Sequence, residues 1–494
     1  MRLYIFCIIN KMKKFLLSIL VACASLGSFA QDKAAADTAR AHRHHHHHRN
    51  GVVFEGNDKK PKVQLYGFVR NYFTYDSHTA QTVNGGLFLT LPNDENLNIL
   101  GEDLNKQPSM QWMAFTTRLG LNLNGPRISE NCMLSGKIEM DFCGYSTYTY
   151  LLRIRQAYAK IAWKQNMLTL GQAWHPMFNS DMMPGCIALA TGSPFQPFNR
   201  SPQIRHNFNF GKKVNEETNK TEGYWRMSTA LLWMLQYTPV GPDKDAIGAG
   251  TTANIKFENN SCIPELYYGL EHVGKKVTIG AGVDLTSLKP RQTRQEKIVL
   301  NGVDTVCTVK SSDRITSVSP VVYFQYKNDN KFKLMAKALI GNNTAHLNMP
   351  SGYGLSSVNE ETGECEYTAL GVFSSWINPT WTINSSKTGN VVKLSLFTGY
   401  QKNLGSKDPM IEEYVKYTSL QHKGGKTLDN CFRIAPAYIY SIKCLDLAIE
   451  YELTGATYGE EEKNQDGLFF GKVVDGTCNT VINNRICAMV KYNF

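Results

Sequence analysis

Arg485-Ile-Cys-Ala-Met-Val-Lys-Tyr-Asn-Phe494, the last ten residues of the chain, alternate between two faces. The even positions from Ile486 to Phe494 are apolar or aromatic, whereas Arg485, Lys491 and Asn493 occupy odd positions. A period of two predicts a β-strand with one apolar face and one mostly polar face. A soluble sheet rarely ends on an uncovered apolar edge strand. In a membrane barrel this edge pairs with the first strand, and the apolar face contacts lipid.

The terminal Phe494, with Tyr492 two residues before it, also resembles the signal by which the outer-membrane assembly machinery recognises barrel substrates. Many unrelated chains end in an aromatic residue, so the interpretation depends on whether the alternation recurs. If it does, the barrel-assembly machinery is an expected partner. Deletion of Phe494 should then hinder assembly without altering the conductance of the protein that does assemble.

The alternation recurs from Val63 onward in segments of about ten residues, the length that a tilted strand needs to cross the hydrocarbon. In 134–142, for example, apolar residues alternate with Ser135, Lys137, Glu139 and Asp141. A Lys or Arg facing lipid at mid-bilayer costs about 2–4 kcal/mol, so the polar faces must share an interior. We predict strands at 63–75, 111–124, 132–143, 151–163, 166–174, 202–210, 224–237, 261–272, 276–288, 313–326, 331–341, 368–379, 390–400, 430–440, 444–458 and 481–494.

The connections between these sixteen strands also alternate. Those after odd-numbered strands are mostly long, as in 76–110, 175–201 and 289–312, whereas those after even-numbered strands are tight turns. Long loops on one rim and short turns on the other are typical of outer-membrane barrels. The expected fold is therefore an all-β, transmembrane antiparallel barrel with long extracellular loops and short periplasmic turns.

Two segments do not keep a clean alternation. In 152–163, Arg153 and Arg155 fall on one parity and Lys160 on the other, which leaves the inward face undecided. In 224–237, Leu232 and Met234 share the side that Arg226 assigns to the interior.

Bulk properties exclude several classes of protein. The mean hydropathy is −0.31 and no run of eighteen apolar residues follows the N-terminal segment, which excludes membrane-spanning helices. The net charge is +11, but the N-terminal segment contributes four positive charges, and residues 31–62 carry seven basic against four acidic residues. The remaining +4 over 63–494 is too small and dispersed for a nucleic-acid partner.

The first thirty residues predict a secretory signal peptide, with residues 1–11 as an upstream extension. Cleavage after Ala30 is favoured over lipidation of Cys23, because residues 24–30 would make an unusually apolar lipoprotein linker. Residues 31–62 form a periplasmic tether, and 63–494 form the barrel. The tether carries a histidine tract, which is interpreted as part of a native, solvated tether. Metal binding by this tract is a less favoured hypothesis, and an engineered tag is a further alternative. The tract comprises His44, His45, His46, His47 and His48.

Several segments resemble the DcaP-type trimeric outer-membrane porins, in the form seen in Bacteroidetes. They are Val63-Gln-Leu-Tyr-Gly-Phe-Val-Arg70, Leu152-Arg-Ile-Arg-Gln-Ala-Tyr-Ala-Lys-Ile161, Gly171-Gln-Ala-Trp174, Asn199-Arg-Ser-Pro-Gln-Ile-Arg205 and Phe432-Arg-Ile-Ala-Pro-Ala-Tyr438. The resemblance covers about 63–494 and is most specific over 152–205. It implies a sixteen-stranded homotrimeric porin that passes small polar or anionic solutes. The chain differs from some members in lacking a heptad-rich N-terminal coiled coil.

The loop after the fifth strand, 175–201, is rich in Pro, Gly, Met and aromatic residues. Surface loops are more polar, so we expect this loop to fold into the channel as a constriction, the alternatives being a surface loop or a trimer latch. Its candidate site residues are His175, Asn179, Asp181 and Arg200. The candidate pore-lining residues are Arg70, Arg118, Lys137, Glu139, Asp141, Arg153, Arg155, Arg205, Lys393, Arg433, Glu450, Glu452, Arg485 and Lys491.

The guanidinium groups of this wall would concentrate anions, unless they only pair with acids such as Glu139, Asp141, Glu450 and Glu452. No catalytic motif is present and no cofactor is expected, although His175 or His206 beside an acid leaves an outer-membrane hydrolase open. A barrel without conductance, serving adhesion or envelope structure, is the main alternative. Lipid and lipopolysaccharide are expected partners. For the acidic run 460–462, a solvated run is favoured over coordination of divalent cations with lipopolysaccharide.

Overall fold

The computed structural model describes residues 52–56, 60–83, 88–144, 151–188, 191–215, 220–234, 261–328, 331–384, 389–411, 415–418 and 426–494. The signal segment, Cys23 and the histidine tract His44–His48 lie outside the described residues. The predictions for these segments therefore remain predictions.

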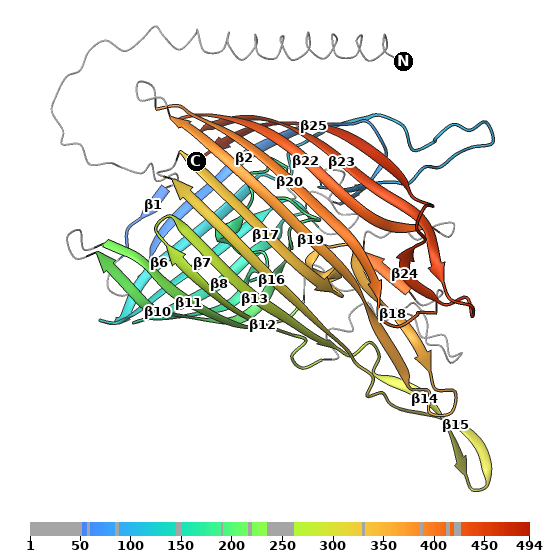
Figure 1. The fold of residues 1–494 in the computed structure, drawn as a ribbon. Helices are drawn as coiled ribbons and strands as arrows, with labels where there is room; N and C mark the ends of the chain where they lie inside the picture. Colours follow the sequence, from blue (N-terminus) through green and yellow to red (C-terminus); the bar gives the residue numbers. More distant parts are fainter. Residues whose placement is uncertain are drawn as a thin grey trace, which may run out of the picture. The chain divides into compact units, whose positions relative to one another are not determined.

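Sixteen antiparallel strands form one closed barrel, as predicted (Figure 1). In chain order they are β2 (Lys62–Asp76), β6 (Arg118–Ser129), β7 (Cys132–Asp141), β8 (Arg153–Trp163), β9 (Asn166–Trp174), β10 (Arg200–Asn215), β11 (Lys220–Leu232), β12 (Glu265–Gly274), β13 (Val277–Leu288), β16 (Ile315–Asn328), β17 (Phe332–Asn342), β19 (Cys365–Asn384), β20 (Val391–Ser406), β22 (Lys426–Ile442), β23 (Leu445–Lys463) and β25 (Asn479–Asn493). Each pairs with its neighbours in this order, and β25 returns to pair with β2.

The long connections carry the remaining elements. These are β3 (Ala80–Val83), β4 (Phe88–Pro92), β5 (Ser109–Met113), η1 (Ser180–Met182), β14 (Thr293–Leu300), β15 (Val303–Lys310), η3 (Ala345–Leu347), β18 (Ser351–Val358), β21 (Val415–Thr418) and β24 (Phe469–Val473), while β1 (Val52–Phe54) precedes the barrel. The β14–β15 hairpin extends away from the wall (Figure 1). No helix among the described residues is long and apolar enough to cross a membrane.

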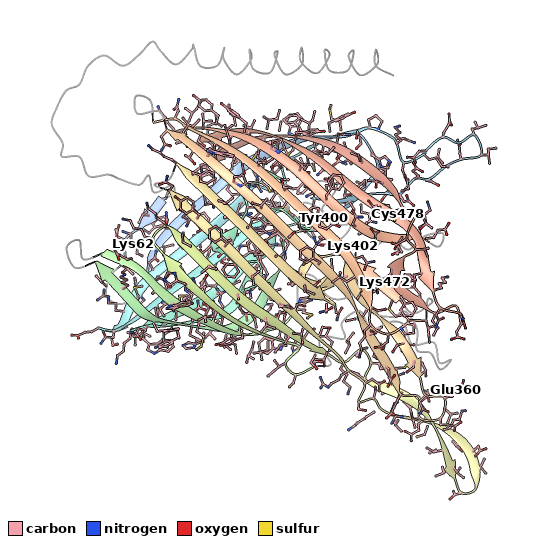
Figure 2. The ribbon with its side chains drawn as sticks, viewed as in Figure 1. Lys62, Glu360, Tyr400, Lys402, Lys472 and Cys478 are labelled. Atoms are coloured by element: carbon pink, nitrogen blue, oxygen red, sulfur yellow. The ribbon has the colours of Figure 1, made fainter. Side chains whose placement is uncertain are left out.

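The closing seam sets the two faces of the wall. Phe68 to Asp76 of β2 pair in unbroken register with Asn493 to Arg485 of β25. Tyr492 is 50% exposed on the outer face, whereas Arg485 is buried inside. Tyr400 of β20 is another outward aromatic side chain (Figure 2). A continuous apolar outer face is typical of a wall that contacts lipid.

A β-bulge in β8 explains why its sequence has no single inward parity. Glu139 of β7 pairs with Gln156, but the next residue, Met140, pairs with Ile154, so one residue of β8 is skipped. Arg155 and Gln156 are consequently both buried. A bulge inserts one extra residue and reverses the parity beyond it, which lets Arg153 and Lys160 both lie on the inner side.

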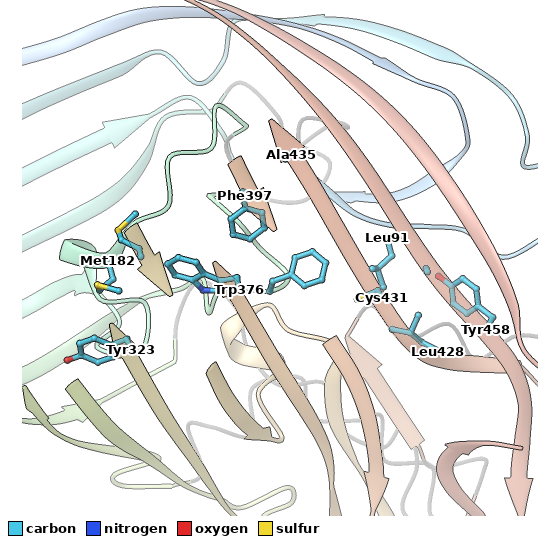
Figure 3. Packing of buried hydrophobic residues seen from close by; sticks show 12 residues of the cluster. Leu91, Met182, Tyr323, Trp376, Phe397, Leu428, Cys431, Ala435 and Tyr458 are labelled. Atoms are coloured by element: carbon cyan, nitrogen blue, oxygen red, sulfur yellow. The ribbon is translucent and has the colours of Figure 1, made fainter. Parts of the chain in front are cut away.

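The barrel interior is packed over much of its height by the long connections. Leu232, on the inner side of β11, lies in a buried cluster with Met177 and with Leu347 of η3. In another cluster, Met182 of η1 packs with Trp376 of β19 and Phe397 of β20 (Figure 3). Apolar residues on the inner side of the wall are therefore covered by protein rather than by water.

Phe494 also contributes to the seam, because its backbone exchanges hydrogen bonds with Gly67 at 3.0 and 3.1 Å. A Cβ on Gly67 would stand 2.6 Å from the Phe494 ring, so the ring lies directly over this glycine. We expect Phe494→Ala to reduce the fraction of folded barrel on heat-modifiability gels, because the seam loses this contact. The matched variant Tyr400→Ala removes an outward aromatic away from the seam and should assemble normally. Equal yields for both would contradict a role for Phe494 in closure.

Candidate functional site

The inner loop, residues 175–199, joins β9 to β10 and crosses the barrel interior. Its ends are adjacent, because Trp174 pairs with Arg200 across the two strands. Its middle reaches the opposite wall, where Glu450 of β23 accepts hydrogen bonds from the backbone amides of Ile187 and Ala188 at 2.9 and 3.0 Å. The structure describes residues 175–188 and 191–199 of this loop. Ile187 and Ala188, in its middle, are held by β23, far from the two strands that the loop connects.

Side chains of β19 and β20 hold the second half of the inner loop. The indole N–H of Trp376 donates to Gln196 Oε1 at 2.8 Å. The Ser374 hydroxyl donates to the Phe195 carbonyl at 2.9 Å, and Gln401 donates to the Pro194 carbonyl at 2.6 Å. Each backbone carbonyl satisfied in this way avoids the cost of a buried unpaired polar group.

Two buried cations also bind backbone carbonyls of segments inside the barrel. Arg433 of β22 donates to the Ser193 carbonyl at 2.9 Å and to the Leu89 carbonyl of β4 at 3.1 Å. Lys337 of β17 donates to the carbonyls of Met177 and Phe178, both at 2.8 Å. These charges fix the inner loop and the β3–β4 hairpin and are not presented to solutes.

A charge network lies on the inner side of β6, β7 and β8. Arg155 binds Glu139 Oε1 at 2.9 Å and Asp141 Oδ2 at 2.7 Å. Arg153 binds Asp141 Oδ1 at 2.7 Å, and Lys137 lies 3.3 Å from Glu139 Oε2. Arg155, Glu139 and Asp141 are all buried, so their charges are matched within the wall.

A cavity of about 710 Å³ lies between the inner loop and the end of the barrel that carries the short turns. Residues 183–187 of the inner loop line it on one side. Its charged lining consists of five basic residues and one acidic residue: Arg70, Lys327, Lys333, Lys393, Lys491 and Asp446. The acid is paired with Lys491 at 3.2 Å. Among the described residues, no carboxylate forms an ion pair with Lys327, Lys333 or Lys393.

A second cavity, of about 220 Å³, lies against the other part of the inner loop. Pro176 and residues 179–181 line it together with wall residues of mixed charge. Among these, Arg226 binds Glu271 at 2.9 Å and lies 3.7 Å from Asp181. The inner loop thus borders two cavities of different electrostatic character.

The barrel matches the outer-membrane channel DcaP of Acinetobacter baumannii with a TM-score of 0.56 at 18% sequence identity, over 90% of this chain and 100% of that one. The chain has a DcaP-like fold. OmpT of Vibrio cholerae and the anion-selective porin from Comamonas acidovorans give TM-scores of 0.45 and 0.42 at 10% identity, over 90% and 88% of this chain and 99% and 100% of theirs. No protein-family model and no curated protein matches the sequence.

The DcaP-like barrel distributes the predicted pore-lining residues over four environments. Arg70, Lys393 and Lys491 line the larger cavity, and Arg205 lines the smaller one. Those that lie in ion pairs or hydrogen bonds within the wall or to the inner loop are Arg118, Lys137, Glu139, Asp141, Arg153, Arg155, Arg433, Glu450 and Arg485, the last bound to Asp76 at 2.8 Å. Glu452 is buried, and its Oε2 has no hydrogen-bond partner.

The predicted residues of the inner loop also separate. Asn179 and Asp181 line the smaller cavity, and the Asn179 side chain caps η1 by accepting from the Asp181 amide at 3.1 Å. His175 and Arg200 are fully buried, which departs from the expectation that they face the channel. Arg200 begins β10 and stacks over Trp174, with its guanidinium carbon 4.6 Å from the ring centroid.

Sequence reasoning did not select Lys327 and Lys333 of the DcaP-like barrel, although both line the larger cavity. They flank the turn between β16 and β17, where a lysine is usually solvent-facing and therefore uninformative. Their relation to Lys393 of β20 depends on the order of strands around the wall. Alternation identifies an inward face but does not show which inward residues share a cavity.

Proposed function

We propose that the chain is an outer-membrane porin that allows passive diffusion of small polar solutes, with a preference for anions. The observation that carries this proposal is the larger cavity, whose charged lining is predominantly basic and includes three lysines without a described ion-pair partner. Low-dielectric walls lined by one sign of charge raise the local concentration of the opposite ion. The DcaP-like fold supports the assignment at the level of architecture.

The inner loop is proposed as the constriction of this pore. It contacts the wall opposite its attachment and borders both cavities, so a solute moving along the interior has to pass it. The proposal also includes export directed by a signal peptide and residence in the outer membrane of a Gram-negative bacterium. There the protein would contact lipopolysaccharide and assemble as a homotrimer. A solved OmpT structure in a trimer form is among the similar folds.

A barrel without conductance is the second candidate, because the inner loop, the β3–β4 hairpin and η3 occupy much of the interior. Purified protein in planar bilayers distinguishes the two functions. A porin gives discrete current steps, in triplets for a trimer, whereas a structural barrel gives none. The absence of enzymatic activity remains a prediction, tested by assaying the same preparation on phospholipid and peptide substrates.

The double variant Lys333→Glu with Lys393→Glu is expected to shift the zero-current potential in a KCl gradient toward K⁺ selectivity. It changes the charge of the larger cavity by four units and places carboxylates where the two unpaired ammonium groups were. The matched control, Lys297→Glu with Lys310→Glu, makes the same change on the β14–β15 hairpin and should leave selectivity unchanged. A wild-type preference for K⁺, or equal shifts in both variants, would overturn the anion proposal.

A further inference from the structure

Two imidazoles and two carboxylates meet inside the barrel, from four separate parts of the chain. His175 begins the inner loop, His346 lies in η3, Glu265 begins β12 and Asp284 lies in β13. One donor atom from each lies within 4.8 Å of the others, and all four side chains are buried. We propose that these residues bind a divalent transition metal ion of the Zn²⁺ class.

Glu265 stands at the centre of this cluster. Its Oε1 lies 2.6 Å from His175 Nε2 and 2.9 Å from His346 Nε2. Asp284 is one step further out, with Oδ1 at 4.0 Å from His175 Nε2 and Oδ2 at 3.9 Å from His346 Nε2. Both imidazoles therefore direct the same ring nitrogen toward the two carboxyl groups.

The hydrogen bonds of the cluster leave several buried acceptors unsatisfied. Asp284 is 1% exposed, and no N–H or hydroxyl group donates to either of its carboxyl oxygens, whose polar neighbour is the Glu265 carboxyl. Glu265 Oε2 is also buried without a partner. A buried carboxylate without donors is costly, and a metal ion at this position would satisfy the acceptors of both carboxylates together.

The donor set fits the chemistry of such an ion. Imidazole nitrogens suit Zn²⁺ and its first-row neighbours, and two carboxylates neutralise the divalent charge. Tetrahedral coordination with ligand bonds of about 2.0–2.1 Å places ligand atoms about 3.3 Å apart. The present spacings of 2.6 to 4.0 Å bracket this value, so Glu265 has to withdraw slightly and Asp284 has to approach.

One contact opposes coordination and limits the expected affinity. His175 Nδ1 accepts a hydrogen bond from the Met177 amide at 3.1 Å. Coordination through Nε2 places the imidazole proton on Nδ1, so this hydrogen bond has to break. We therefore expect binding to be weaker than at a preorganised structural zinc site and to shift the start of the inner loop. The bound ion would link the inner loop and η3 to two wall strands, independently of what the channel transports.

The test uses folded, detergent-solubilised barrel from which residues 42–49 have been deleted, because the histidine tract is itself a metal-binding candidate. Zn²⁺ is added during refolding as well as afterwards, since the cluster is closed to solvent. After dialysis, elemental analysis should find one Zn²⁺ per chain. Substitution with Co²⁺ should give the visible absorption bands of a low-symmetry four-coordinate site. Less than one tenth of an equivalent would overturn the proposal and identify the cluster as a pair of carboxyl groups that shares a proton.

Variants at the cluster establish where the ion binds. Asp284→Asn and His346→Gln should each lose most of the bound metal, whereas His206→Gln, on the outer face of β10 and paired with Asn166, should keep it. Retention of metal by both cluster variants would also overturn the proposal. Heat-modifiability gels confirm that each variant is folded. Zn²⁺ should raise the thermal unfolding temperature of the parent protein but not that of Asp284→Asn. If neither cluster variant folds, the Co²⁺ absorption spectrum of the parent protein decides whether the metal site exists.

Discussion

Replacing residues 177–196 with a short Gly-Ser linker is expected to raise single-channel conductance several-fold. The ends of the inner loop are already adjacent, since His175 N donates to the Asn199 carbonyl at 3.1 Å, so the shortened connection can close without moving β9 or β10. The deletion removes the segment that borders both cavities and joins them into one wider passage. Planar-bilayer recording measures the step size directly.

A matched control shortens the β14–β15 hairpin by removing residues 297–306, which lie outside the barrel ladder. It should leave conductance unchanged. The deletion also uncovers inner apolar residues such as Trp376, so folding has to be verified on gels before recording. A correctly folded deletion protein with wild-type step size would refute the constriction.

Asp141→Ala is expected to lower the free energy of unfolding by about 3 kcal/mol, the lower end of the range for breaking a buried ion pair. The carboxylate is fully buried and binds both Arg153 and Arg155 at 2.7 Å. Its removal leaves Arg155 with Glu139 and takes away the Asp141 contact of Arg153. The lower end applies because Arg153 is 20% exposed and water screens part of its charge. Urea titration of the barrel in lipid vesicles gives the free energy.

Glu55→Gln serves as the control for this prediction, because Glu55 also pairs with a cation, Lys62, at 2.6 Å. That pair is largely exposed, and surface ion pairs contribute about 0–1 kcal/mol. A cost for Asp141→Ala as small as that of Glu55→Gln would show that water reaches the β6–β8 network freely.

The sequence predicted the barrel because the physical cause of the pattern is local. Lipid on one side and a polar interior on the other act on every second residue, so strands such as β9, expected at 166–174, were located correctly. The break in β8 was visible as conflicting parity at Arg155 and Lys160. Its cause was not, because a bulge is defined by the register with the neighbouring strand.

The contents of the barrel were much less predictable than its wall. Glu450 was expected to line the pore, and its carboxylate accepts hydrogen bonds from amides of the inner loop. Arg433 was expected to attract anions and instead binds backbone carbonyls. The cluster around His175 brings together residues 81 and 90 positions apart in sequence. None of these contacts follows a period, because they depend on how irregular connections fold back into the interior.

The anchoring of the inner loop at both ends and at its middle has a mechanical consequence. A sixteen-stranded cylinder is wide relative to its single-layer wall, so lateral pressure from the bilayer tends to flatten it. A segment fixed to β9 and β10 on one side and to β19, β20 and β23 on the other acts as a cross-brace. The same residues that we propose as the constriction would thereby keep the cross-section of the barrel constant as the surrounding membrane changes in thickness or tension.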